Sequence, residues 1–198
     1  MNKTVDEIPA SLEGSKTGEN LQAAFGAECK ASVLYAWYAK AARRAGYEEI
    51  GRVFEETAAN EREHAEIWFR ALGGHGDTAD TLRRSAEGEH HEWTSMYRDY
   101  AATAREEGFE RIAALFDRVA EVEERHEKRY TDYRERLEAG ELFTSNSETT
   151  CWICLNCGYA VTAKEAPKVC PACAHPQGYF RPETEEEKRM TAKPSVIS

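Results

Sequence analysis

Two short motifs place a glutamate three residues before a histidine. The first pairs Glu61 with His64, and the second pairs Glu123 with His126. Side chains three residues apart project from one face of a helix, so each pair can reach a single metal ion. Carboxylates can bridge two cations and offset their charge, and a neutral imidazole adds a nitrogen ligand that suits iron. These residue types at this spacing indicate metal chemistry.

An internal duplication relates the two motifs and adds two more glutamates. A shift of 61 residues aligns Glu28 with Glu89, and a shift of 62 aligns Tyr35 with Tyr97 and the first motif with the second. One glutamate from each of two helices and a Glu-x-x-His pair from each of two others form the ligand set of ferritin-like di-iron and di-manganese bundles. Without a metal, these groups would leave uncompensated charge in a bundle core. We therefore predict a dinuclear metal centre.

Three further residues lie close to this set in the sequence. Glu92 follows Glu89 by one turn and has no acidic counterpart in the first half of the duplication, so it would make the centre asymmetric. Tyr35 and Tyr97 are either core aromatics or hydrogen-bond donors to ligand carboxylates. The change of offset from 61 to 62 places one extra residue between Glu89 and Tyr97. A continuous helix absorbs such a residue most easily as a π-helical turn, which we predict here.

Five of the six cysteines crowd into residues 151–173. Four of them form two C-x-x-C pairs, which are Cys154, Cys157, Cys170 and Cys173. Four thiolates suit either zinc or a mononuclear iron, and the spacing leaves the choice of metal open. Cys151 offers an alternative pair with Cys154, but only Cys157 is followed by the open Gly-Tyr turn. We take Cys151 as the spare cysteine.

Four long helices are needed to position the acidic and imidazole groups. The segment from about residue 19 to 139 has no proline and is rich in strong helix formers, with glycines at the breaks. Its apolar residues recur at helical spacing, so each helix has a face to bury. We expect helices near residues 19–45, 47–72, 79–107 and 109–139. The predicted fold is mainly α, a four-helix bundle followed by a small metal domain.

Composition divides the chain into four parts. We expect the bundle over residues 1–140, a polar linker over 141–150, the cysteine module over 151–182 and a solvated polar tail over 183–198. The cysteine module has too little apolar material for a core of its own. A metal must therefore hold it together.

Charge and hydropathy argue against binding to nucleic acid or membrane and against secretion. The 198 residues include 26 basic and 36 acidic side chains, and the net charge of −10 repels polyanions such as nucleic acid. No apolar run approaches the ~20 residues of a membrane-spanning helix. The first twenty residues lack the pattern of a secretory signal. We expect a cytoplasmic protein that binds neither nucleic acid nor membrane.

Four segments resemble the rubrerythrin family, and the resemblance spans roughly residues 17–181. They are NLQAAF at 20–25, NEREHA at 60–65, GEHHEW at 88–93 and CPACAHPQ at 170–177. The resemblance implies a ferritin-like di-iron four-helix bundle fused to a rubredoxin-like domain that holds one iron on four cysteines, where zinc also fits.

The resemblance also implies which residues act. The di-iron ligands would be Glu28, Glu61, His64, Glu89, Glu92, Glu123 and His126, and the ligands of the single iron would be Cys154, Cys157, Cys170 and Cys173. Glu92 would replace His64 on one iron as the centre oxidises. Tyr35 and Tyr97 would complete the catalytic set.

In that family, the two sites cooperate to reduce hydrogen peroxide to water in oxidative-stress defence. The resemblance implies an NAD(P)H-linked peroxidase whose electrons arrive through a rubredoxin or its reductase, and a head-to-tail homodimer. Two other interpretations stay open. A ferroxidase or iron-handling protein needs no attached electron-transfer domain, and a regulatory protein would use the cysteine module as a structural zinc ribbon.

Overall fold

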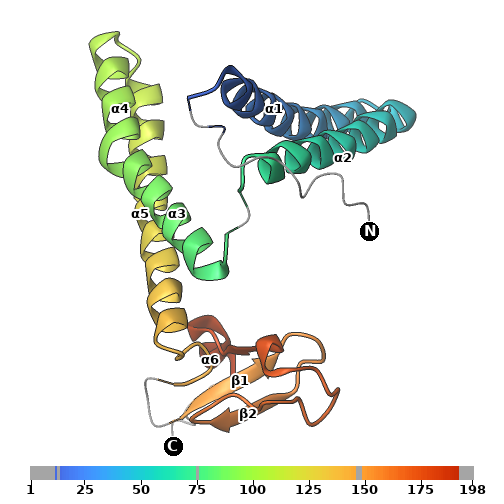
Figure 1. Cartoon of the computed structure of the whole chain (residues 1–198), viewed down its shortest axis with the longest axis vertical. Helices are drawn as coiled ribbons and strands as arrows, with labels where there is room; N and C mark the ends of the chain where they lie inside the picture. Colours follow the sequence, from blue (N-terminus) through green and yellow to red (C-terminus); the bar gives the residue numbers. More distant parts are fainter. Residues whose placement is uncertain (1–11, 13, 75, 146–148, 192–198) are drawn as a thin grey trace, which may run out of the picture. The chain divides into compact units, whose positions relative to one another are not determined.

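The computed structural model describes residues 12, 14–74, 76–145 and 149–191, and most of them are helical (Figure 1). The helices are α1 (Lys16–Arg44), α2 (Glu48–Ala71), α3 (Thr78–His91), the π-helical η1 (Glu92–Met96), α4 (Tyr97–Glu106), α5 (Glu110–Glu138), the 3-10 turn η2 (Gln177–Tyr179) and α6 (Glu185–Thr191). The strands are β1 (Thr150–Cys154), β2 (Ala160–Ala163) and β3 (Phe180–Pro182). The predicted fold class is confirmed: mainly α, with a small metal domain at the C-terminal end.

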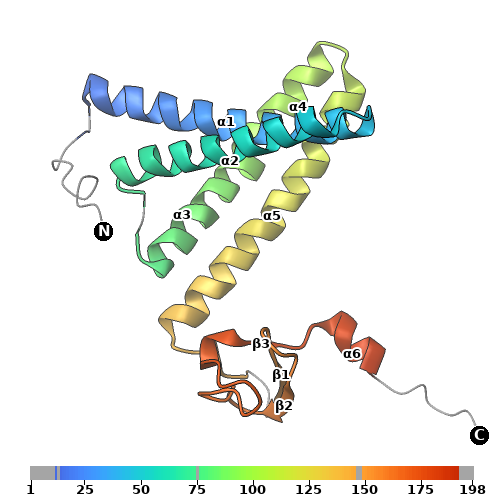
Figure 2. The same ribbon diagram turned by 90° about the vertical axis from the view of Figure 1, so that its right-hand side faces the viewer.

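Helices α1 and α2 lie side by side and form the first hairpin (Lys16–Ala71; Figure 2). The Ser15 hydroxyl caps α1 by accepting a hydrogen bond from the Gly18 amide at 3.0 Å. At the turn, Gly46 has a φ of +86°, a left-handed conformation that glycine adopts without strain. The Tyr47 amide then donates to the Ala42 carbonyl at 3.0 Å and closes the end of the helix.

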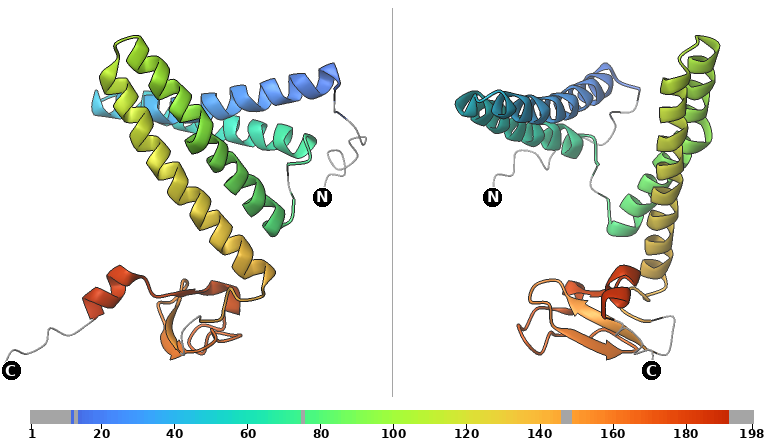
Figure 3. Two further views of the ribbon diagram at one scale, coloured as in Figure 1. Left: turned by 90° about the vertical axis from the view of Figure 1, so that its left-hand side faces the viewer. Right: turned by 180° about the vertical axis from the view of Figure 1, so that it is seen from behind.

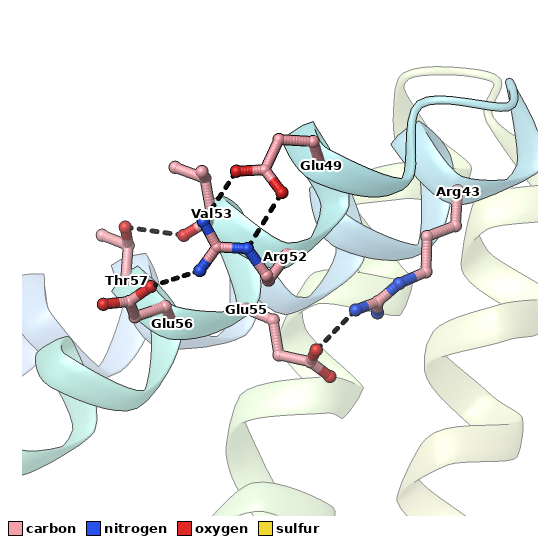
Figure 4. A network of polar contacts seen from close by, with 7 residues as sticks. All are labelled: Arg43, Glu49, Arg52, Val53, Glu55, Glu56 and Thr57. Carbon is pink, nitrogen blue, oxygen red and sulfur yellow. Dashed lines mark hydrogen bonds and ion pairs between the residues drawn. The ribbon is translucent and has the colours of Figure 1, made fainter.

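Salt bridges line the first hairpin (Figure 4). Arg52 reaches Glu49 at 2.7 Å and Glu56 at 3.0 Å, one turn away on either side. Arg43 on α1 reaches Glu55 on α2 at 2.5 Å and so joins the two helices. These charges are exposed, so each pair adds little stability.

The second hairpin (Thr78–Glu138) contains α3, η1 and α4 on one side and α5 on the other (Figure 3). The first three elements form one helix interrupted by the π-helical segment, as the extra residue in the duplication predicts. The four long helices of the sequence analysis are therefore confirmed, with ends within a few residues of the expected ones.

Both hairpins repeat the same packing, which is the duplication realised in three dimensions. Ala39 and its counterpart Ala101 are almost fully buried. An aromatic triplet also recurs. The ring of Phe54 lies 6.0 Å from Tyr35 and 5.6 Å from Tyr38, and Phe116 lies 6.0 Å and 5.6 Å from the matching Tyr97 and Tyr100. The Arg43–Glu55 pair recurs as Arg105–Asp117.

The cysteine module is an antiparallel three-stranded sheet with strand order β2-β1-β3. The expectation that this module has too little apolar material for a core of its own is wrong, because Phe143 and Val161 pack against a small buried cluster. That cluster contains Trp152, which is 1% exposed, and Phe180 together with two of the cysteines. The start of the predicted linker joins this module, because Phe143 packs against the core and accepts a hydrogen bond from the Ala166 amide at 2.8 Å. The expected boundaries of bundle, linker, module and tail stay predictions.

The region expected to be a solvated tail contains a short helix, α6. A capping box starts it: the Glu187 amide donates to the Thr184 hydroxyl, and the Glu187 carboxylate accepts from the Thr184 amide. The Arg181 guanidinium donates two hydrogen bonds, of 2.6 and 2.7 Å, to the same carboxylate. Residues 192–198 of the expected tail lie outside the described part of the chain. Among the described helices, none combines the length and hydropathy needed to cross a membrane.

Candidate metal centres

The first hairpin brings three predicted ligands together. Glu28 on α1 and the pair Glu61 and His64 on α2 offer ligand atoms that all lie within 4.8 Å of one another. The Nδ1 atom of His64 lies 2.9 Å from the Glu61 carboxylate. The i, i+3 spacing thus orients both side chains of the α2 motif toward one point, as predicted.

The second hairpin repeats this arrangement with the matching residues. Ligand atoms of Glu89 on α3 and of Glu123 and His126 on α5 also lie within 4.8 Å of one another. The Nδ1 atom of His126 lies 2.7 Å from the Glu123 carboxylate and 3.7 Å from that of Glu89. This group is the more enclosed of the two, since the Glu123 side chain is only 13% exposed.

The electrostatics of the second group fit a bound cation. Burial raises the pKa of the Glu89 carboxyl above its ordinary value, and the charge of Glu123 raises it further. Burial also raises the pKa of Tyr97, and the charge that adds most to this effect is that of Glu92. Carboxylates gathered in a partly enclosed place repel one another, and a divalent cation among them reverses this penalty.

Three predicted site residues are not among the clustered ligand atoms, namely Glu92, Tyr35 and Tyr97. Glu92 begins η1 and is not among the three side chains whose ligand atoms cluster in the second hairpin. Its charge nevertheless acts on both Glu89 and Tyr97. The rings of Tyr35 and Tyr97 pack in the aromatic triplets described above. The donor role of their hydroxyl groups stays a prediction.

Sequence reasoning missed a polar cluster between the π-helical segment and α5. The Glu127 carboxylate on α5 accepts a hydrogen bond from the indole of Trp93 and contacts the Nδ1 atom of His90 at 3.0 Å. The guanidinium of Arg98 lies 5.4 Å from the Trp93 ring centre. These residues bracket Glu92 along the chain. Because Glu127 has no acidic counterpart in the duplication, that pattern gave no signal for it.

The four cysteines of the two C-x-x-C pairs converge on one point. Their sulfur atoms all lie within 4.8 Å of one another, with Cys154 to Cys173 and Cys157 to Cys170 both at 3.7 Å. Four sulfurs held about 2.3 Å from a central ion in a tetrahedron would lie about 3.8 Å apart, so the spacing matches a metal site. The four sulfur atoms are therefore arranged as in a metal site with four thiolate ligands.

Backbone groups of the two cysteine turns prepare the sulfurs for a metal. Gly158 has a φ of +75°, which shapes the turn after Cys157. In the second turn, the His175 amide hydrogen-bonds the Cys173 sulfur and is the largest of several contacts that lower the pKa of this thiol, which favours the thiolate that binds metal. Hydrogen bonding among the four sulfurs raises the pKa of Cys157 instead, so the cluster shares its protons until a metal displaces them. Cys151 lies outside the group. It is three residues before Cys154 on β1, so the two side chains point to opposite faces of the strand.

Comparison with known proteins agrees with both centres. The family model "Rubrerythrin" matches residues 19–133, and the model "Rubrerythrin, rubredoxin-like domain" matches residues 152–181. The rubrerythrin of Porphyromonas gingivalis is 45% identical over 193 residues, which cover 91% of this chain and 96% of the relative. Rubrerythrin-1 of Clostridium acetobutylicum and the rubrerythrin of Nitratidesulfovibrio vulgaris are each 42% identical, over 86% of this chain and 95% of the relative. The similarity therefore spans the hairpins and the cysteine module together.

Proposed function

The chain belongs to the rubrerythrin family, and we propose that it reduces hydrogen peroxide to water at a di-iron centre that its own cysteine module re-reduces. The observation that carries this proposal is the presence of both kinds of metal site in one chain. Iron storage requires no dedicated source of electrons. Repeated reduction of peroxide does require one, and a covalently attached tetrathiolate iron can supply it.

The cofactors of the family fit the side chains that are present. The chain carries a di-iron carboxylate site of Glu and His groups and a rubredoxin-like site of four cysteines. The proposed di-iron ligands are Glu28, Glu61, His64, Glu89, Glu92, Glu123 and His126. The proposed ligands of the single iron are Cys154, Cys157, Cys170 and Cys173.

Glu92 and His64 are the residues that we propose respond when the di-iron centre is oxidised and becomes more positive. When bound, the two irons would supply two electrons to peroxide, and the tetrathiolate iron would return electrons singly. An additional carboxylate would offset the charge of the centre once it is oxidised. Glu92 stands at the edge of the second group and is the carboxylate available for this purpose. His64 is the neutral ligand that we propose it replaces, and its side chain is half exposed, so it has room to withdraw.

Tyr35 and Tyr97 would keep the ligand carboxylates oriented by hydrogen bonding. Burial and the charge of Glu92 raise the pKa of Tyr97, so its hydroxyl stays protonated at neutral pH and can donate. A phenol that holds its proton beside carboxylate ligands stabilises their ionised form. The matched position of Tyr35 suggests the same role in the first hairpin.

Electrons would enter through the cysteine module from an external protein such as a rubredoxin or its reductase, and ultimately from NAD(P)H. We further propose a head-to-tail homodimer and a cytoplasmic location. The use of paired C-x-x-C cysteines for a metal, in place of disulfides, suits a reducing compartment.

Stopped-flow mixing of the fully reduced protein with peroxide or with O₂ tests the activity. We expect peroxide to oxidise the di-iron centre faster than O₂ does, followed by oxidation of the tetrathiolate iron. The matched control is the Cys154→Ser variant, which should show the first phase alone. Faster oxidation by O₂ together with uptake of added ferrous iron would favour the ferroxidase alternative. A colourless module containing zinc would favour the zinc-ribbon alternative.

A further inference from the structure

Of the two hairpins, only the second has a helix that a π-helical segment interrupts. In η1, the Tyr97 amide donates a hydrogen bond to the Glu92 carbonyl, five residues earlier. The two long helices of the first hairpin, α1 and α2, are α-helical along their whole described length. Because π-turns are rare inside α-helices, contacts that only the second hairpin makes are the candidates for its support.

Trp93, the second residue of η1, contacts three other side chains. Its indole N–H donates to the Glu127 carboxylate on α5. The His90 ring lies 5.7 Å from the Trp93 ring, and the Arg98 guanidinium lies 5.4 Å from its centre. Glu127 is 25% exposed and also contacts the Nδ1 atom of His90 at 3.0 Å. These four residues form the Trp93 cluster.

The contact between Trp93 and Arg98 depends on the π-helical register. The two residues are five positions apart. In an α-helix with 3.6 residues per turn, side chains five positions apart point about 140° away from each other. In a π-helix, whose hydrogen bonds join residues five apart, they lie close to the same face. The cation–π contact therefore favours the π-helical register over the α-helical one.

The first hairpin lacks the members of this cluster, just as it lacks a counterpart of Glu92. The matching positions hold small side chains, which are Cys29, Ala31 or Ser32, Ala36 and Ala65. Ala65, which corresponds to Glu127, is 6% exposed and leaves no room for a similar contact network. The half of the duplication that carries Glu92 and the π-turn is thus also the half that carries these contacts.

Fixing the direction of Trp93 also fixes that of its neighbour Glu92. Consecutive side chains of a helix are about 100° apart around its axis, so one sets the direction of the other. Trp93 is joined to α5 through Glu127, whereas the charge of Glu92 acts on Glu89 and Tyr97 in the ligand group. In an α-helical register, either Trp93 would leave Glu127 or Glu92 would leave the ligand group.

We propose that the Trp93 cluster positions Glu92 as the carboxylate available to the oxidised di-iron centre, by holding the helix in its π-helical register. Trp93, Glu127 and Arg98 are positioning residues, because they act through Glu92. This inference rests on the proposed function, which gives Glu92 its role. The hydrogen bond to Glu127 joins the segment to α5, and the contact with Arg98 selects the register.

Amide hydrogen exchange of the metal-free protein tests whether the cluster holds the segment. Trp93→Phe keeps a ring beside Arg98 but removes the indole N–H, and Arg98→Ala removes the cation–π contact. We expect exchange over residues 92–96 to be about 10-fold faster in the first variant and about 3-fold faster in the second. Trp37→Phe, at a tryptophan of α1 that is 58% exposed, is the matched control and should exchange as the wild type. Unchanged exchange in Trp93→Phe would overturn the proposal.

A double-mutant cycle with Glu92→Ala tests whether the cluster acts through Glu92. In the otherwise wild-type protein, we expect Trp93→Phe to slow the oxidation of the reduced protein by peroxide about 5-fold. In the Glu92→Ala background, the same substitution should have no further effect, because the residue that Trp93 positions is gone. Equal slowing in both backgrounds would show that Trp93 acts independently of Glu92, against the proposed positioning role.

Rescue by a conservative variant separates the hydrogen bond from a general loss of packing. Glu127→Gln keeps an oxygen that can accept from the Trp93 indole, whereas Glu127→Ala removes it. We expect the first variant to keep most of the wild-type exchange protection and peroxide rate, and the second to lose both. Equal losses in the two variants would contradict positioning through this hydrogen bond. A wild-type protein that peroxide does not oxidise, with the exchange differences intact, would count against the proposed function alone.

Discussion

Glu92 is the residue whose role depends most on position. It differs from the other acidic ligands because it lies in η1, where the helix holds one extra residue relative to its duplicate. Its charge reaches Glu89 and Tyr97, but its ligand atoms are not part of the compact group. This placement suits a carboxylate that binds only when the centre becomes more positive.

Replacing Glu92 with alanine should leave the fold intact and slow oxidation by peroxide. We expect the rate for the reduced variant to fall on the order of 10- to 100-fold, because the oxidised centre loses a ligand. Stopped-flow absorbance measures this rate. Glu121→Ala on the exposed side of α5 is the matched control and should behave as the wild type. A Glu92→Ala rate equal to that of the control would remove Glu92 from the mechanism.

The cysteine module offers an equally specific substitution. Cys154→Ser should prevent metal loading of the module, because three thiolates cannot complete the tetrahedral site. The iron of the di-iron centre should stay, since its proposed ligands lie on the hairpins. Cys151→Ser is the control and should load both sites. Metal analysis and visible absorption distinguish the two sites, and loss of both in Cys154→Ser would show that they are not independent.

At the scale of elements, the π-helical segment is supported by contacts with Glu127, a residue that is not one of the proposed metal ligands. Glu127 on α5 bonds to Trp93 and contacts His90, which lie on either side of Glu92. A π-helical turn is less favourable than the α-helix around it and persists where other contacts support it. We interpret Glu127 as a positioning residue for this segment.

Glu127→Ala should therefore loosen η1 without unfolding the hairpin. We expect faster amide hydrogen exchange over residues 92–96 of the metal-free protein, with little change at Ala101 or Ala113 in the buried packing. Lys128→Ala, which removes only an exposed salt bridge to Glu124, is the control. Unchanged exchange in Glu127→Ala would show that the helix maintains the π-turn without this support.

Helix α6 should depend on pH through Glu187. Arg181 and the Thr184 amide lower the pKa of this carboxyl to about 2. A lowered pKa in the folded state stabilises α6 above the ordinary value near 4.5, and the contribution is lost as the pH falls toward 2. Amide exchange or NMR shifts of residues 185–191 should report this loss. In the Glu187→Gln variant, α6 should exchange its amide protons faster already at pH 7. If this variant showed the same dependence of exchange on pH as the wild type, Glu187 would not be the group responsible.

At the scale of the whole molecule, repetition made much of the structure predictable. The matched Glu-x-x-His pairs predicted one dinuclear centre, and the structure brings three of its proposed ligands together in each hairpin. The union of the two groups into one centre stays a prediction. The single-residue change of offset predicted the π-helical segment, and the C-x-x-C spacing predicted the four-sulfur cluster. All these patterns are either local in the sequence or repeated along it. They can therefore be recognised in a single sequence without knowledge of its tertiary contacts.

The features that sequence reasoning missed depend on contacts between distant residues. Glu127 meets Trp93 across 34 positions, and nothing in the sequence near either residue marks the pair. The helix α6 depends on Arg181 as well as on its capping box, and its charged composition suggested only a solvated tail.

The central claim is that peroxide draws electrons from both metal centres of this chain. Anaerobic titration of the fully ferrous protein with hydrogen peroxide tests it most directly, with both chromophores followed together. Each peroxide takes two electrons and each chain would hold three, so we predict complete oxidation of both centres at about 1.5 equivalents of peroxide per chain. Oxidation of the di-iron centre while the tetrathiolate iron stays reduced would contradict the account.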